Sequence, residues 1–254
     1  MTTGESEPRK PETRARRPDW LATLGIPLAV FTLCLVVDLY ASPRLTSDVG
    51  RPALLALLAS LAQVLVIVSV VPWWSAGLLE RNSFGTLIAA LRVTTMTLSA
   101  TVLLLLLVSL EGHGGFAATL KVQVVVLCVG LLAAGLAGAF RLILRSTSAA
   151  GLLTMLLGYL ALASPFWGNL LVKGMSESRK SWAVDLVVKL SPMSAVSSAV
   201  GYDLFRGRVL YTLSVVSDYR HALPAWWAYG LVTGIAGLAL IVTVTSVSRR
   251  LTRR

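Results

Sequence analysis

Residues 122–140 read VQVVVLCVGLLAAGLAGAF, a stretch without any charged side chain. At about 1.5 Å of rise per residue, a helix of roughly 20 apolar residues crosses the ~30 Å hydrocarbon core of a bilayer. Five other stretches resemble it in length and apolar character: 20–40, 53–74, 87–110, 151–172 and 225–247. The whole chain is 56% hydrophobic and 14% charged, against about a quarter charged in soluble domains. The sequence therefore predicts an all-α integral membrane protein with six transmembrane helices.

The basic residues predict the orientation of these helices. With both termini in the cytoplasm, thirteen basic residues lie on the inside: Arg9, Lys10, Arg14, Arg16, Arg17, Arg81, Arg92, Arg141, Arg145, Arg249, Arg250, Arg253 and Arg254. The two short outside loops carry three: Arg44, Arg51 and Lys121. The other seven lie in one long loop, to which the positive-inside rule does not apply. We therefore expect a multi-pass protein of the cell's inner (plasma) membrane, with N- and C-termini cytoplasmic.

This topology divides the chain into three parts. Residues 1–18 are rich in proline and charge and predict a disordered, basic cytoplasmic tail. Residues 19–248 form the six-helix transmembrane domain, and residues 249–254 a second basic cytoplasmic tail. The long external loop, 173–224, carries two apolar stripes at helical spacing, separated by Ser191-Pro192. They predict short amphipathic external helices between helices 5 and 6, the first with Ser181 as its N-cap and an Asp185–Lys189 ion pair.

The predicted helices contain few groups that could perform chemistry. Ionisable residues inside a membrane usually mark a functional site, and only Asp38 and Arg92 come close, both near a helix end. No Walker A, HExxH or GxSxG motif and no Cys/His metal spacing occurs. We expect no catalytic, cofactor-binding or metal site, no nucleic-acid partner and no enzymatic activity in this chain, so any ATP hydrolysis belongs to a separate subunit.

Small residues four positions apart predict helix-packing faces. Gly130, Ala134 and Gly138 form one ridge, and Gly230 and Gly234 form a GxxxG pair. Such residues let two helix backbones approach closely. The pattern does not distinguish packing within one chain from packing between two chains.

The second inside loop carries the most specific motif. Residues 80–91 read ERNSFGTLIAAL. An acidic and a basic residue, a glycine and a short amphipathic helix would form a compact polar element at the membrane surface, suited to docking a soluble partner. The candidate docking residues are Glu80, Arg81, Gly85, Thr86, Leu87 and Leu91.

This segment resembles the ABC-2 type permeases, the membrane subunits of ATP-binding cassette exporters. An acidic-Arg pair followed by Gly-Thr-Leu recurs in that family between the second and third helices, where it forms the coupling helix that sits in a groove of the ATPase. The six-helix layout and the segment Leu190-Ser191-Pro192-Met193-Ser194-Ala195 in the long loop are also similar. The chain departs from the family in having Ile88, Ala89 and Ala90 in place of an acidic residue and two leucines, and in lacking an amphipathic elbow helix before residue 19.

The resemblance implies a permease subunit of an ABC-type transporter. Its partners would be a cytoplasmic ATP-binding cassette ATPase subunit, a second permease chain as homo- or heterodimer, and membrane lipids. The scarcity of charge within the helices favours a lipid-like or amphipathic substrate over a small ion. Two alternatives stay open: a non-transporting multi-pass scaffold or assembly protein, and a membrane-bound enzyme.

Overall fold

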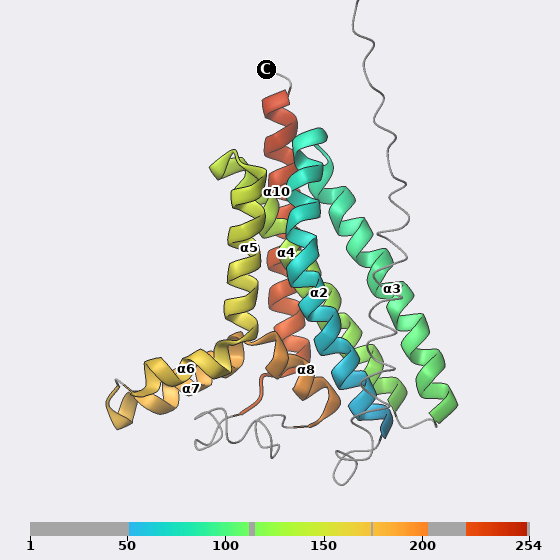
Figure 1. Cartoon of the computed structure of the whole chain (residues 1–254), viewed down its shortest axis with the longest axis vertical. Coiled ribbons are helices and arrows are strands. Elements are labelled where there is room, and N and C mark those ends of the chain that lie inside the picture. The colour runs from blue at the N-terminus through green and yellow to red at the C-terminus, as the bar shows by residue number, and fades with distance from the viewer. Residues whose placement is uncertain (1–50, 112–114, 174, 203–221, 253–254) are drawn as a thin grey trace, which may run out of the picture.

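A computed structural model describes residues 51–111, 115–173, 175–202 and 222–252, and it is built of helices (Figure 1). They are α2 (Arg51–Arg81), α3 (Gly85–Glu111), α4 (Phe116–Leu144), α5 (Thr147–Leu162), α6 (Ser164–Lys173), α7 (Glu177–Leu190), α8 (Pro192–Val200) and α10 (Trp226–Thr252). The predicted tail 1–18 and the predicted first transmembrane helix, 20–40, lie outside the described residues.

Four helices in the described part of the chain are long and apolar enough to cross a membrane: α2, α3, α4 and α10. The pair α7–α8, bent by 78° at Ser191, raises this number to five if it forms one broken span. The chain is therefore a multi-pass helical membrane protein. Residues 249–252, predicted to belong to a tail, continue α10 as helix.

Helix α4 lies at the centre of the bundle, and α2, α3, α5, α8 and α10 pack around it. Its buried face consists of small and β-branched residues, among them Val125, Val126 and Ala134, which have no exposed surface. They join Ile67 of α2 and Val93 of α3 in the main apolar core. Small side chains on α4 allow several helices to contact it at once.

The predicted fifth transmembrane helix, 151–172, is wrong as a single helix. Helix α5 spans 16 residues, or about 24 Å, and ends at Leu162; α6 then begins at Ser164. Pro165 favours a break here, because proline has no N–H group to donate and its ring clashes with the carbonyl four residues earlier. The Ser164 hydroxyl donates to the Val187 carbonyl at 3.0 Å, which fixes the new direction of the chain.

Helices α6 and α7 form a hairpin that extends sideways from one end of the bundle (Figure 1). Helix α8 follows the hairpin and packs against α4 and α2. The predicted Asp185–Lys189 pair is confirmed, with 3.1 Å between Lys189 Nζ and Asp185 Oδ2. The predicted N-cap, Ser181, is wrong: α7 begins four residues earlier, after Ser176. Helix α8 ends at Val200 and is capped by Gly201, whose positive φ of 77° suits glycine.

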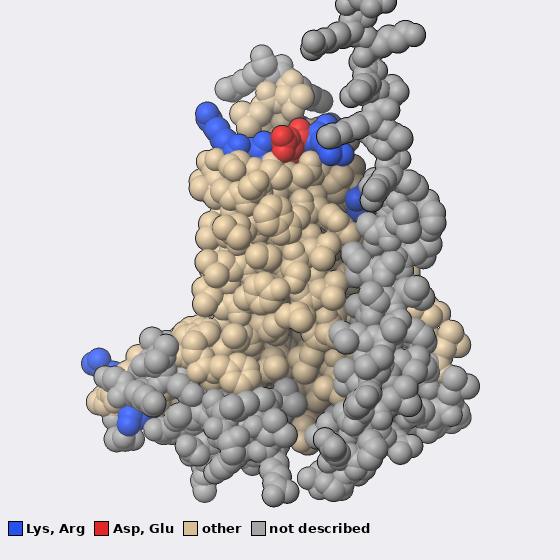
Figure 2. Space-filling model, viewed as in Figure 1, with Lys and Arg blue, Asp and Glu red and all other residues tan. Residues whose placement is uncertain are grey.

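On the face that Figure 2 shows, the charged side chains of the described residues gather toward two ends and leave an uncharged belt between them. At one end α2 and α4 finish, α3 and α5 begin, and α10 finishes; we call it the Glu80 end. The hairpin of α6 and α7 marks the opposite end, which we call the α7 end (Figure 1). The belt is the part of the surface that hydrocarbon would cover.

Candidate docking site at the Glu80 end

A three-residue turn, residues 82–84, joins α2 to α3 at the Glu80 end. The Asn82 side chain accepts a hydrogen bond from the Phe84 N–H at 3.0 Å, and the Asn82 carbonyl accepts one from the Gly85 N–H at 2.8 Å. Asn82 thus closes the turn with both its side chain and its backbone. The separate short amphipathic helix predicted within residues 80–91 is wrong, because the helix that starts at Gly85 is α3 itself.

Gly85 allows the two helices to meet at this turn. A Cβ atom built on Gly85 would lie 2.1 Å from the Leu78 carbonyl carbon and 2.2 Å from the Leu79 nitrogen, both backbone atoms of α2. No side chain fits at such distances. The close approach of two helix backbones therefore accounts for glycine at residue 85.

Thr86 packs inward rather than toward a partner. It has no exposed surface, and a Cβ built on Gly138 of α4 would meet its Oγ1 at 2.8 Å and Val244 of α10 at 3.0 Å. Its hydroxyl lacks a hydrogen-bond partner among the described residues. Thr86 therefore joins the start of α3 to the ends of α4 and α10 and is not part of the exposed turn.

Glu80 is exposed, and its carboxylate is held from a third helix. The Thr147 hydroxyl, at the first residue of α5, donates a hydrogen bond to Glu80 Oε2. Ser146, the N-cap of α5, accepts from the Ala149 N–H at 3.3 Å. The α2–α3 turn and the α4–α5 turn are thereby joined at the same end of the bundle.

Arginines surround this acidic group. In the part of the chain that the structure describes, the Glu80 end carries Arg81, Arg92, Arg141, Arg145, Arg249 and Arg250. The Arg249 guanidinium lies 5.1 Å from the centre of the Phe84 ring, within the range of a cation–π contact. Arg141 Nε is buried and has no hydrogen-bond partner among the described residues. The described part of this end is thus strongly basic, with Glu80 as its one acidic residue.

Leu87 and Leu91 lie on the side of the bundle rather than at its end. They are 42% and 60% exposed and begin a stripe of exposed residues that continues through Leu98, Val102 and Leu106 of α3. Spacings of four and seven residues place these side chains on one face of α3, which borders the uncharged belt. Of the six candidate docking residues, the structure leaves only Glu80 and Arg81 exposed at the tip, with Gly85 supporting the turn.

The predicted packing residues lie between helices of the same chain. A Cβ on Gly130 would meet Val93 of α3 at 2.4 Å, and the Ala134 carbonyl accepts from Ser75 of α2 at 2.7 Å. On α10, Gly234 lies against Cys128, 3.0 Å from its sulfur to the added Cβ, and Gly230 lies 3.8 Å from the same sulfur. The structure thus places both small-residue faces in the packing of one chain, with Gly138 against Thr86 as above.

A further close contact, between the backbones of α4 and α10, involves two glycines that the sequence did not single out. A Cβ on Gly237 of α10 would lie 2.6 Å from the Leu132 nitrogen, and one on Gly135 of α4 would lie 2.9 Å from the Gly237 carbonyl. Gly237 follows Gly234 by three residues, so the spacing of glycines along residues 230–237 was the signal that could have shown this contact.

Two buried amides connect α2 and α4 within the bundle. Gln123 Nε2 donates to Gln63 Oε1 at 2.8 Å, and both side chains are 4% exposed. Gln63 Nε2 and Gln123 Oε1 have no partner among the described residues. Interhelical hydrogen bonds of this kind fix which faces of two membrane helices meet.

Comparisons of the chain with family models, curated proteins and solved structures find no match. Among the described residues, no group of three or more His, Cys, Asp or Glu side chains could hold a metal ion. The geometry of the Glu80 end is therefore the main guide to function. Thr147 and Arg249 belong to this site, and the sequence did not connect them to it because they lie far along the chain from residue 80.

Proposed function

We propose that this chain is the membrane subunit of an ATP-binding cassette exporter. It has six transmembrane helices in the plasma membrane, with both termini and the Glu80 end in the cytoplasm. Two permease chains pair, and each binds a separate ATPase subunit. The cargo is a lipid-like or amphipathic molecule.

The observation that carries this proposal is the construction of the exposed turn at the Glu80 end. Glu80 and Arg81 stand at the tip of two long helices, and the turn is supported by backbone contact at Gly85 and by the Thr147 hydroxyl. The Glu80 carboxylate is thereby held from a second helix. A small, charged and well-ordered projection is the shape that a soluble partner can bind in a groove.

The charge around the turn supports a cytoplasmic position and an acidic partner surface. Six arginines surround one carboxylate in the described part of this end, and cytoplasmic ends of membrane proteins are enriched in basic residues. Complementary charge across an interface raises the rate of association and selects the partner.

The same contacts provide a path for mechanical coupling. Closure of two ATPase subunits on ATP displaces whatever sits in their grooves. Because Gly85 touches the α2 backbone and Glu80 is hydrogen-bonded to the start of α5, a displacement of the turn pulls on α2, α3 and α5 together. These helices would then change their positions around α4.

The charge-free belt supports the choice of cargo. In the described helices, the buried polar groups of the bundle are uncharged side chains such as Gln63, Thr97 and Gln123, and the charged residues gather toward the two ends. An ion pathway normally needs ionisable or water-lined groups within the membrane. An apolar bundle suits a molecule that is itself largely apolar.

Charge reversal at Glu80 tests the proposal. In the full chain expressed in its native host, Glu80→Lys removes the acceptor for the Thr147 hydroxyl and adds a basic residue to the six arginines of this end. Loss of one charged group at a desolvated interface costs about 2 to 5 kcal/mol, so copurified ATPase should fall by more than about tenfold. Asp185→Lys, on α7 at the opposite end, is the matched control and should keep the ATPase.

The proposal is contradicted if Glu80→Lys and Asp185→Lys copurify with equal amounts of ATPase. ATP turnover in reconstituted membranes should follow the same order as association. If wild-type chain purified in mild detergent carries neither ATPase nor a second permease, the scaffold function takes the place of transport.

A further inference from the structure

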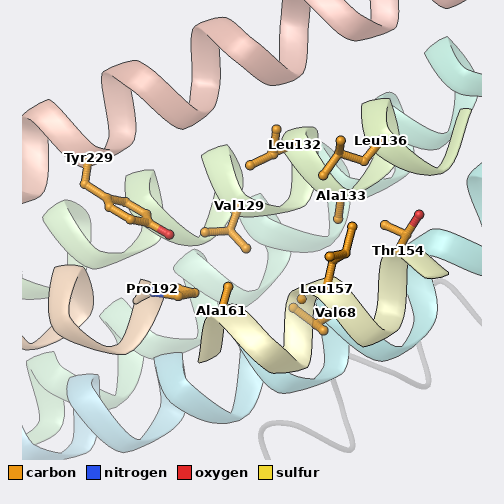
Figure 3. Close-up of a pocket in the computed structure, with 11 residues that line it drawn as sticks. Val68, Val129, Leu132, Ala133, Leu136, Thr154, Leu157, Ala161, Pro192 and Tyr229 are labelled. Carbon is orange, nitrogen blue, oxygen red and sulfur yellow. The ribbon is translucent and has the colours of Figure 1, made fainter. Parts of the chain in front are cut away.

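A partly open cavity of about 100 Å³ lies in the side of the bundle, next to the central helix α4 (Figure 3). Its floor is one face of α4, formed by residues at positions i, i+3, i+4 and i+7: Val129, Leu132, Ala133 and Leu136. Helix α5 contributes one wall, and Tyr229 of α10 and Pro192 of α8 lie at the end nearer α7 (Figures 1 and 3). The cavity extends along about two turns of α4, or roughly 10 Å.

Two glycine contacts, one of α5 with α2 and one of α10 with α4, explain why this space is not filled. A Cβ on Gly158 would meet Val68 at 2.5 Å, so α5 is held tightly against α2. Gly135 and Gly237 hold α10 against another side of α4. Helices α5 and α10 therefore make almost no contact with each other, and the face of α4 between them stays open.

The lining is almost wholly apolar. Its two hydroxyl groups belong to Thr154 and Tyr229, and the Thr154 hydroxyl donates to the Ala150 carbonyl at 2.8 Å. A buried water molecule needs two to four polar partners, so this cavity would stay dry. An engineered apolar cavity of about 150 Å³ in another protein stays dry and binds benzene, so a space of this size suits a short run of methylene groups.

The Tyr229 hydroxyl places a polar group at one end of the cavity. The Tyr229 side chain points into the cavity, and no hydrogen bond joins its hydroxyl to any residue that the structure describes (Figure 3). Tyr229 lies one turn from Trp226, where α10 begins at the α7 end. Tyrosine at such a depth usually meets the polar part of the bilayer with its hydroxyl and the apolar part with its ring.

We propose that this cavity binds part of one acyl chain of an amphipathic lipid. The chain lies along the Val129–Leu136 face of α4, and the lipid's polar portion lies toward the α7 end, where the Tyr229 hydroxyl donates a hydrogen bond to an ester or headgroup oxygen. The site lies within the uncharged belt, where acyl chains surround the protein. That the bound lipid is the exported cargo rests on the proposed function; binding of its chain does not.

Photolabelling of the full chain in phosphatidylethanolamine vesicles tests the site. The probe is a phosphatidylcholine whose acyl chain ends in a diazirine, and labelled peptides are mapped by mass spectrometry. We expect label on Leu132, Leu136 and Leu157. Ala133→Leu fills the cavity and should lower this labelling at least fivefold, whereas Ala239→Leu adds the same atoms to an exposed position of α10 and should not change it. Tyr229→Phe keeps the ring and should lower labelling about three- to tenfold, the effect of one lost hydrogen bond.

Competition by an unlabelled lipid on the wild-type protein tests the same site without any substitution. Excess unlabelled oleic acid should suppress label on the cavity residues more strongly than label on the exposed α3 residues Leu98 and Val102. Equal suppression at both places, or labelling of the cavity that Ala133→Leu and Ala161→Leu leave unchanged, overturns the inference. Label in the cavity without any copurifying ATPase keeps the lipid site and rejects the transporter, so the two proposals fail separately.

Discussion

At the scale of single residues, glycine positions decide how closely the helices approach. Gly85 and Gly77 lie near the same end of the bundle, but a Cβ on Gly85 would lie 2.1 Å from the α2 backbone and one on Gly77 would have no atom within 4 Å. Backbone cannot move aside as a flexible side chain does. The two positions therefore form a matched pair for testing the contact at the α2–α3 turn.

We predict that Gly85→Ala lowers the melting temperature of the purified protein and that Gly77→Ala does not. Overpacking against fixed atoms costs about 1–3 kcal/mol, whereas alanine within a helix is favoured over glycine by roughly 0.5–1 kcal/mol. Thermal unfolding of both variants in the same detergent checks this. Equal melting temperatures would mean that α2 and α3 are farther apart than the structure shows.

The Gln63–Gln123 hydrogen bond gives a second prediction at this scale. Either single change to leucine leaves one amide buried without a partner, so the double variant Gln63→Leu/Gln123→Leu should be less destabilised than the sum of the single variants. Coupling of about 0.6 to 1.7 kcal/mol is typical of such pairs in membranes. Unfolding free energies in mixed micelles measure it, and additive effects would show that the two amides do not interact.

At the scale of helices, apolar length predicted α2, α3, α4 and α10 because a membrane helix needs a continuous run of apolar residues. The same criterion failed for α5 and α6, because Ser164-Pro165 interrupts the helix without interrupting the apolar character of the segment. A proline within a transmembrane helix is tolerated in many cases, so its presence alone does not fix a break. The Ser164–Val187 hydrogen bond, which depends on tertiary contact, decides it here.

The docking turn was predictable only in part, because some of its contacts come from residues far along the chain. Residues 80–85 are adjacent in sequence, so their pattern could show a charged pair followed by a glycine. Thr147 and Arg249 reach the turn through the packing of α5 and α10, which sequence spacing does not encode. Thr86, chosen from the same pattern, is buried against Gly138, because the first turn of α3 faces α4.

Helix α7 supports a prediction about its place at the membrane surface. Trp182, Leu186 and Leu190 are exposed on one face, at 65%, 41% and 53%, and Lys189 lies on another. An exposed apolar face beside charged residues is typical of a helix that lies in the interface. A spin label at residue 186 should collide with oxygen more often than a label at residue 189. The label at residue 189 should collide more often with a water-soluble nickel complex. Equal accessibility at both positions would place α7 in water.

At the scale of the whole molecule, the proposed orientation depends on the basic residues at the Glu80 end. In a background with Cys34 and Cys128 replaced by alanine, a cysteine at residue 179 of α7 should react with a membrane-impermeant maleimide on intact cells. A cysteine at residue 252, at the end of α10, should react only after permeabilisation. The reverse pattern would place the Glu80 end outside the cell and exclude contact with a cytoplasmic ATPase.

The central claim is that the turn at the Glu80 end binds an ATPase, and a photo-crosslink from that turn tests it most directly. Phe84 and Phe116 are exposed phenylalanines at opposite ends of the bundle, 39% and 50% accessible, so each can be replaced in turn by benzoylphenylalanine. We predict that residue 84, under light in intact cells, captures a protein whose sequence contains GxxxxGK[ST] and which binds ATP, and that residue 116 does not. Capture of this protein from neither position, or equally from both, would contradict the account.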